Sequence, residues 1–218
     1  MYTPKHFEEP RIEVMHELMR ARSLATVVTF GSGAIAANHL PLHLSTTPAP
    51  LGTLYGHVAR ANPVWRDLDP NVQALAIFEG PGAYVSPSWY ETRKTTGRAV
   101  PTWNYVVAHA RGFLRLVEDP AWLRAHLEAL TRHQESEFTR PWTMSDAPSD
   151  YIEGMMGAIV GIEIVVTRLE GKWKVSQNQP PENQRGVIAG LSKKGDEESL
   201  AIAALVKTRG AADAEPDR

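Results

Sequence analysis

The chain has no cysteine among its 218 residues, and this absence excludes several kinds of chemistry. Disulfide bonds, thiol nucleophiles, iron–sulfur clusters and cysteine-ligated zinc sites all need a residue that is not there. Long hydrophobic runs are also missing, because the longest one, MMGAIVGIEIVV, is interrupted by Glu163 and is too short to span a bilayer. The opening residues, MYTPKHFEEP, lack the basic-then-apolar layout of a secretory signal. We therefore expect a soluble cytoplasmic protein with no membrane partner.

A strong charge of either sign is absent as well. The formal net charge is -2 and the isoelectric point is about 6.5, so the chain has no general attraction for nucleic acid. No helix-turn-helix pattern is visible, and Lys193-Lys194 is a basic spot of only two residues. Direct DNA binding therefore has no support from charge or from a motif.

The motifs of several large enzyme classes are missing too. The sequence contains no phosphate-binding G-x-x-x-x-G-K-[ST] loop, no H-E-x-x-H zinc motif and no G-x-S-x-G elbow. GPGAYV has Val85 where a dinucleotide-binding fingerprint needs its third glycine, and it leads into a strand. An enzyme built on one of these familiar sets of side chains is not indicated.

What is present is a succession of short strand patterns with helices at both ends and in the middle. Helices are expected at 10–22, at 63–68, at 151–156 and, with a break near Gly195, at 181–208. A further helix is expected to be capped by Asp119 and Pro120, with Leu123, Leu127 and Leu130 as its apolar stripe. Strands are expected at 24–30, 34–44, 52–59, 72–80, 82–87, 101–112 and 113–119, and as a pair within 158–177 around a turn at Glu170-Gly171.

Pro41 cannot donate to a ladder, so the strand that contains it is expected at a sheet edge or at a bulge. The hydrophobic content of 43% suffices for a sizeable core. These patterns predict a mainly β protein with flanking helices, a β-barrel in one domain over 1–208, followed by a disordered tail at 209–218.

The stretch LYGHVARANPVW carries the first candidate site. Arg60 precedes Asn62 and Pro63, which suit the N-cap and first position of a short helix. Arginine binds phosphate in bidentate fashion, and a helix N-terminus adds backbone donors, so this spacing can hold a phosphate. A surface arginine beside an ordinary helix cap explains the same residues, and the spacing alone does not separate the two interpretations.

Two polar and aromatic clusters, YVSPSWYE at 84–91 and VPTWNY at 100–105, form the second candidate site. Rings can flank a planar heterocycle while hydroxyls and amides meet its polar edge, although core aromatics give the same pattern. The intervening loop is rich in Arg and Lys, which favours a shared site. His39 and His43 fall on one strand face, where hydrogen bonding at a barrel rim is favoured over metal binding because no carboxylate partner is near in sequence.

Several motifs together resemble the PaiB family of FMN-binding negative transcriptional regulators. They are MYTPKHF, NHLPL, GTLYGHVARANP, YVSPSWYE, VPTWNY, RLEGKWKVSQNQ and RGVIAGL, in this order from Met1 to about Leu191. The resemblance implies an FMN-binding split β-barrel related to the pyridoxamine phosphate oxidase fold, and a homodimer with FMN at the interface.

The resemblance also implies which residues contact the cofactor. Arg60 and Asn62 correspond to the phosphate-binding element, and the residues at 103–105 to a wall contributed by the partner subunit. Gly82 and Gln179 depart from the family pattern, where histidine and arginine are common. The full set of implied cofactor contacts is His39, Leu40, His57, Arg60, Asn62, Ser86, Ser88, Trp89, Tyr90, Trp103, Asn104, Tyr105, Lys174, Gln177 and Asn178.

The function implied by the resemblance is flavin-dependent transcriptional regulation as a homodimer. A flavin-dependent oxidoreductase that reduces flavin with NAD(P)H or reduces a small molecule is the alternative, because a flavin itself supplies redox chemistry. Haem binding or degradation is a third hypothesis, since some split-barrel proteins degrade haem and histidines lie in the expected strands.

Overall fold

The structure is a computed structural model that describes residues 1–210. Its strands form one sheet with the order β3-β2-β6-β7-β8-β5-β4, and β1 pairs with β8. The strands are β1 (Glu8–Glu9), β2 (Leu24–Gly31), β3 (Ala34–Pro41), β4 (His43–Ser45), β5 (Thr53–Ala59), β6 (Ala74–Val85), β7 (Thr102–Val117) and β8 (Ile159–Lys174). The helices are α1 (Ile12–Ala21), α2 (Val64–Asp67), α3 (Arg93–Thr96), α4 (Pro120–Gln134), α5 (Ser149–Gly157), α6 (Pro181–Lys194) and α7 (Glu197–Gly210).

The chain divides into two compact units. Unit 1 comprises 1–11, 79–108 and the chain from 170 onward, and unit 2 comprises 12–78 and 109–169. The strands β6, β7 and β8 each contribute residues to both units. This division does not test the predicted single domain over 1–208, which stays a prediction. Helix α7 extends to Gly210, and the remainder of the predicted tail, 211–218, lies outside the described residues.

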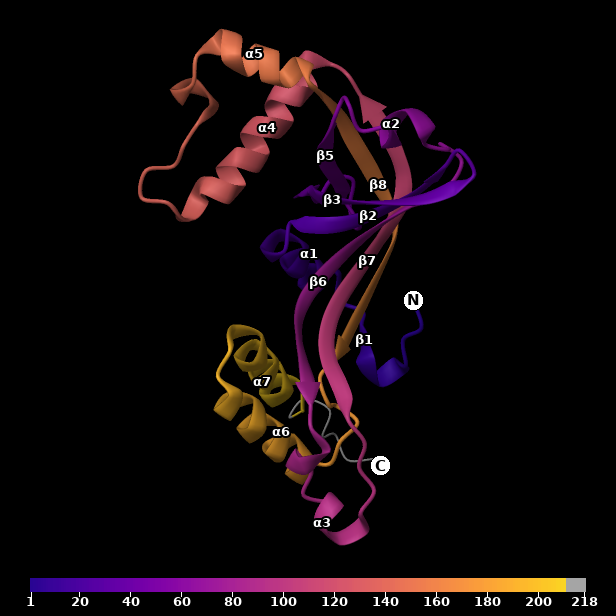
Figure 1. Ribbon diagram of the computed structural model, residues 1–218, viewed down its shortest axis with the longest axis vertical. Helices are drawn as coiled ribbons and strands as arrows, with labels where there is room; N and C mark the ends of the chain where they lie inside the picture. Colours follow the sequence, from indigo (N-terminus) through magenta and orange to yellow (C-terminus); the bar gives the residue numbers. More distant parts are fainter. Residues whose placement is uncertain (211–218) are drawn as a thin grey trace. The chain divides into compact units, whose positions relative to one another are not determined.

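Unit 2 contains the hairpin of β2 and β3 and the paired strands β4 and β5 (Figure 1). In the hairpin, Leu24 pairs with Pro41 and Gly31 with Ala34, and the turn is made by Ser32 and Gly33, both with positive φ. Alternate residues of β2 are buried, as a strand with one face on a core requires. Strand β3 ends the sheet, which confirms the edge position predicted from its proline.

Helices α4 and α5 of unit 2 pack against each other through Leu123, Ile152 and Met156. Helix α4 begins as predicted, because Asp119 accepts a hydrogen bond from the amide of Ala121 and proline occupies the first turn. The cap fixes the residue at which α4 begins, and with it the positions of the polar side chains along this helix.

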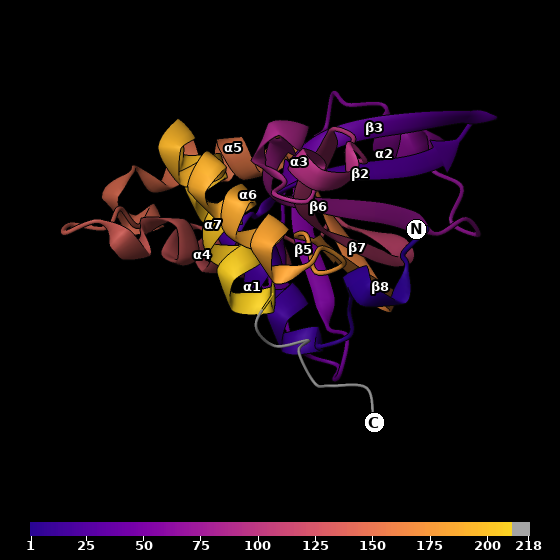
Figure 2. The ribbon, with the colours of Figure 1, turned by 90° about the horizontal axis from the view of Figure 1, so that it is seen from below.

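Unit 1 contains α6 and α7, which lie side by side (Figure 2). Their shared core includes Val187, Leu191, Ile202 and Val206, all fully buried. The predicted break between them is confirmed at Gly195, whose φ of 76° ends α6.

Two glycines of α6 allow Trp89 to lie against the helix. A Cβ at Gly190 would meet the Trp89 ring at 2.3 Å, and one at Gly186 would meet the Trp89 carbonyl oxygen at 1.8 Å. Any larger residue at either position would collide with this tryptophan. The short 3-10 helix Pro87–Trp89 is thereby held on α6.

Three predicted strand breaks are wrong. The chain runs straight through Gly80-Pro81-Gly82 in β6, through Gly112 in β7 and through Glu170-Gly171 in β8. These glycines serve extended strands rather than turns. At Gly112 the reason is close approach, because a Cβ there would lie 2.1 Å from the carbonyl oxygen of Val165.

Candidate functional site

Unit 1 contains a cavity of about 610 Å³ at the start of β7 and the end of β8. Its size lies in the range of small-molecule sites. The wall is made of two cations, hydroxyls, side-chain amides and one tyrosine, and no carboxylate from the described residues lines it. The lining residues are Tyr90, Thr92, Gly97, Arg98, Ala99, Val100, Thr102, Asn104, Lys174, Ser176, Asn178, Gln179 and Asn183.

Lys174, the last residue of β8, presents its ammonium to this cavity. Its Nζ donates to Thr102 Oγ1 and, at 2.7 Å, to the carbonyl oxygen of Trp103. Burial lowers the pKa of Lys174 below its ordinary value, and the nearby charge of Lys172 lowers it further. Both bonded oxygens are uncharged, so no carboxylate compensates this cation.

The floor of the cavity is an ordered set of polar groups. Asn104, which is 1% exposed, donates from Nδ2 to Ser176 Oγ at 2.9 Å. Ser176 adopts a φ of 63°, in the left-handed region, directly after β8. Tyr90 is also buried, and its burial raises the pKa of the phenol. These groups offer fixed hydrogen-bond partners to a polar ligand.

Asn183 closes one side of the cavity from the first turn of α6. Its Oδ1 accepts from the amide and hydroxyl of Thr92, and its Nδ2 donates to Gln179 Oε1 at 3.0 Å. Gln179, where the family pattern commonly has arginine, is therefore engaged in the wall and adds no charge to it. The other departure, Gly82, leaves room, since a Cβ there would meet its nearest neighbours at 3.7 and 3.8 Å.

Four of the predicted contacts, Tyr90, Asn104, Lys174 and Asn178, share this cavity. Several others in unit 1 have structural partners elsewhere. Ser86 caps the 3-10 helix by accepting from the amide of Ser88 at 3.2 Å, while Trp89 lies against α6.

The remaining predicted residues of unit 1 also lie outside the cavity lining. Trp103 is 57% exposed and meets Tyr84 edge-on, and Tyr105 lies under the ammonium of Lys172. Gln177 turns back to its own strand, where its Oε1 accepts from the amide of Val175. None of these contacts tests the cofactor roles, which stay predictions.

In unit 2, Arg60 makes a set of contacts within the protein. Its guanidinium pairs with Glu118 at 2.6 Å and donates to the carbonyl oxygens of Gly157 and Ile159. It lines a separate cavity of about 490 Å³ beside α4 and α5. The arginine therefore ties the end of β5 to α5, and its predicted phosphate contact stays a prediction.

Asn62 faces a different cavity, a groove of about 310 Å³ along β3. Its Nδ2 donates to Asn38 Oδ1, and its Oδ1 accepts from the amide of Val64 at 3.0 Å. The prediction of Asn62 as the N-cap is wrong by one residue, because helix α2 begins at Val64, spans only four residues and has Pro63 at its N-cap. Arg60 and Asn62 do not line a common cavity, because the guanidinium is held on the α5 side.

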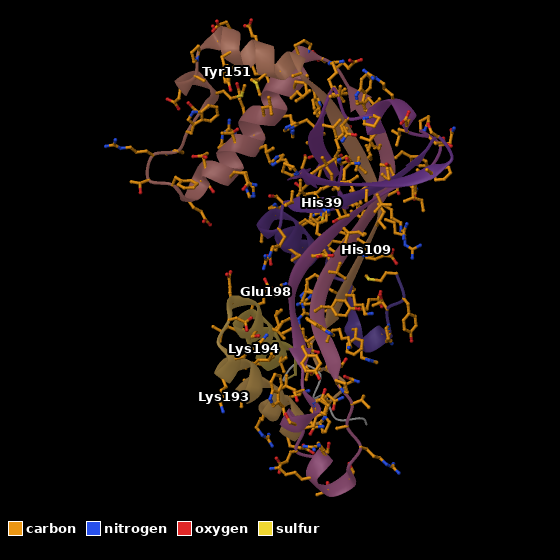
Figure 3. All side chains as sticks on the ribbon, in the orientation of Figure 1. His39, His109, Tyr151, Lys193, Lys194 and Glu198 are labelled. Carbon is orange, nitrogen blue, oxygen red and sulfur yellow. The ribbon has the colours of Figure 1, made fainter. Side chains whose placement is uncertain are left out.

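The predicted histidine and leucine contacts of unit 2 have different surroundings. His39 is exposed on β3, with its Nδ1 3.1 Å from Thr26 Oγ1 (Figure 3). Leu40 lines a small apolar void under β2. His57 is bonded through Nδ1 to His126 Nε2 at 3.1 Å, and burial lowers its pKa. A neutral histidine in this setting supplies no charge for an anion.

Sequence reasoning missed five polar residues of the unit 1 cavity, namely Thr92, Arg98, Thr102, Ser176 and Asn183. A signal existed for Arg98, because the loop between the two aromatic clusters is rich in cations. Ser176 lies within the quoted motif RLEGKWKVSQNQ but was not singled out, and no sequence pattern marks Asn183, which reaches the cavity from the first turn of α6.

Comparison with known proteins places this chain in a family. Residues 1–168 match the family model described as "Putative FMN-binding domain", so the chain belongs to this flavin-binding family, whose cofactor is FMN. The protein named "Protease synthase and sporulation protein PAI 2" of Bacillus subtilis is 30% identical over 96% of this chain and 98% of its own length. An uncharacterised protein of Emericella nidulans is 32% identical with the same coverage. The predicted resemblance to the PaiB family is therefore confirmed.

A solved structure confirms the predicted fold class. The FAD and haem binding protein of Mycobacterium smegmatis superposes with a TM-score of 0.54 at 17% identity, covering 77% of this chain and 73% of that one. The fold is the flavin-binding split barrel, mainly β with flanking helices. None of the helices within 1–210 has the length and apolar character needed to cross a bilayer.

Proposed function

We propose that this protein is an FMN-binding negative transcriptional regulator of the PaiB type that acts as a cytoplasmic, flavin-bound homodimer. The observation that carries the proposal is the polar, cationic cavity of unit 1 in a chain of the FMN-binding family. Its hydroxyls and amides match the hydrogen-bonding edge of a flavin, and Lys174 and Arg98 match an anionic group. The donor set therefore fits FMN.

The flavin supplies redox chemistry when bound, and the residues of this chain bind and orient it. Tyr90 would provide an aromatic wall, while Asn104 and Asn178 would hydrogen-bond polar atoms of the ligand. The other contacts implied by the family resemblance, including His39 and Arg60, stay predicted cofactor contacts.

A homodimer is supported by the apolar side chains left at the surface of each unit. In unit 1, Trp103 is 57% exposed and Val100 is 72% exposed. In unit 2, Ile35 on the edge strand β3 is 76% exposed and Leu24 on β2 is 65% exposed. Large exposed apolar groups on sheet surfaces are typical of protein interfaces. A second copy of this chain would cover them.

The experiment that tests flavin binding is the visible spectrum of the purified protein before and after FMN is added. We expect a flavin spectrum that elutes with the protein on gel filtration, at the elution volume of a dimer. A spectrum that stays with the free small molecule would contradict the cofactor proposal. Elution as a monomer in the presence of saturating FMN would contradict the dimer.

Regulation by direct DNA contact would need a basic surface, and the two-lysine spot on α6 is a weak one (Figure 3). Lys193 and Lys194 are exposed, but Lys194 pairs with Asp196 at 3.2 Å. A gel shift at low salt decides the point, with Lys193 and Arg185 changed to glutamine in a matched variant. Retention of operator binding by the variant, or no binding by either protein, would exclude this surface as the DNA contact.

A further inference from the structure

The charges around the unit 1 cavity are unbalanced. Two of its lining residues, Lys174 and Arg98, carry positive charge, and no described residue brings a carboxylate to the wall. Lys174 is half-buried and Arg98 is exposed, so both cations can be reached from the solvent. Two cations with no carboxylate beside them give the wall of this cavity of about 610 Å³ a positive potential, which favours an anionic ligand.

Lys174 is held in place by uncharged groups. Two donors of its ammonium are directed to Thr102 Oγ1 and the Trp103 carbonyl oxygen, which fixes the Nζ position. An ammonium has three donors, so one remains for a ligand. Nearby Lys172 is occupied elsewhere, since its Nζ donates to the carbonyl oxygen of Tyr2 and lies over the Tyr105 ring.

Unlike the ammonium of Lys174, the guanidinium of Arg98 has no hydrogen-bond or ion-pair partner among the described residues. Only its backbone is fixed, through an amide that donates to Thr96 Oγ1 at 3.1 Å. Gly97, with a φ of 66°, ends α3 and turns the chain so that Arg98 follows on the cavity wall. Arg98 therefore combines a placed backbone with an uncommitted bidentate donor.

We infer that this cavity is an anion-binding site in which Lys174 is a fixed donor and Arg98 closes on the ligand, a phosphate or a carboxylate. The inference rests on the proposed function where the anion is the phosphate of bound FMN. The same chemistry would serve a separate small anionic ligand held beside the flavin. In both cases the ammonium and the guanidinium contact the anion directly.

Binding measurements on the full chain separate the two sources of the anion. FMN and riboflavin are titrated separately by flavin fluorescence, and inorganic phosphate is titrated by calorimetry. The variants are Arg98→Gln and Lys174→Met, with Arg93→Gln as the matched control, because Arg93 is an exposed arginine of α3 that does not line the cavity. Arg98→Gln removes no internal contact, so its effect does not depend on the folding of the lysine variant.

If the site holds the flavin phosphate, Arg98→Gln and Lys174→Met each weaken FMN by about tenfold or more and leave riboflavin unchanged. If the site holds a separate ligand, FMN affinity stays constant while the wild-type protein binds inorganic phosphate and both variants lose it. Placing a second guanidinium on the wall with Gln179→Arg should strengthen whichever anion binds.

The inference is overturned if neither variant weakens FMN more than riboflavin and the wild-type protein binds no inorganic phosphate. It is also overturned if Arg93→Gln matches the effect of Arg98→Gln, because the charge would then act without contact. Failure of the wild-type protein to bind either flavin would refute the proposed function alone, and the phosphate titration would still decide the anion site.

Discussion

The buried histidine pair of unit 2 predicts that this protein loses stability in mild acid. His57 on β5 and His126 on α4 share one hydrogen bond of 3.1 Å, and the Trp122 ring stacks on His126 at 5.3 Å. His126 Nδ1 is buried with no partner among the described residues. The pKa of His126 falls from 6.5 to about 4, mainly because burial disfavours the charged ring and in part because of the nearby charges of His57 and His43.

The sign and size of the effect follow from the two states. The folded protein keeps His126 neutral down to a pH near its pKa of about 4, whereas the unfolded chain takes up the proton near pH 6.5. Between these values the unfolded state binds more protons, so the free energy of unfolding falls as the pH falls. The loss is about 2 kcal/mol at pH 5 and approaches about 3 kcal/mol near pH 4.

Urea unfolding followed by circular dichroism at pH 7 and pH 5 measures this loss. His126→Gln removes the titrating ring, so this variant should lose about 2 kcal/mol less than the wild type over the interval. His6→Gln, an exposed histidine of unit 1, serves as the matched control and should behave like the wild type. An equal loss in the wild type and in His126→Gln would refute the reasoning, because the acid sensitivity would then come from other groups.

Three further perturbations have outcomes set by named contacts. Arg209→Ala removes one of the two arginine partners of the buried Glu9 carboxylate and should destabilise the protein by about 2 kcal/mol in chemical denaturation. Burial raises the pKa of Glu9, but the hydrogen bonds from its arginine partners outweigh burial and lower this pKa overall. Gly190→Val would place a Cβ 2.3 Å from an indole atom and should cost about 2 kcal/mol or more. Gly154→Ala, at an exposed position inside α5 where a Cβ meets nothing within 4 Å, should instead stabilise the protein by about 0.5 to 1 kcal/mol. If the unit 1 cavity holds a separate anion rather than the flavin phosphate, Arg60→Ala should weaken FMN more than riboflavin, and equal weakening would refute its predicted phosphate contact.

Local chemistry made part of the fold predictable. The cap of α4 at Asp119, the break after α6 at Gly195 and the edge position of the strand with Pro41 each follow from one residue's backbone requirement. The predicted strand breaks were wrong because glycine occurs both in turns and where two strands approach closely, and the sequence does not separate these two cases. At Gly112 the absent side chain admits the backbone of a neighbouring strand, and only the paired partner reveals this use.

The candidate site was predictable to the extent that its residues sit in recognisable motifs. Tyr90, Asn104 and Lys174 come from quoted clusters and share one cavity. The sequence could not show whether a polar side chain binds the cofactor or pairs with another residue of the protein. Arg60 is an example, because its partner Glu118 is distant along the chain and meets it only after folding. Trp89 is an aromatic example: the sequence does not show that this ring packs on the helix α6 at two glycines rather than against a cofactor.

In each unit one tryptophan packs against a glycine, and this packing gives each unit a spectroscopic signal. In unit 1 the indole of Trp89 lies on Gly190, and in unit 2 the indole of Trp122 lies on Gly161, where a Cβ would be 2.4 Å away. Each ring is held in a fixed, asymmetric environment of its own unit, which is the condition for a near-ultraviolet circular dichroism signal. The chain has six tryptophans, so the difference between the spectra of the wild type and of a phenylalanine variant at Trp89 or Trp122 would report the melting of the unit that carries the replaced ring.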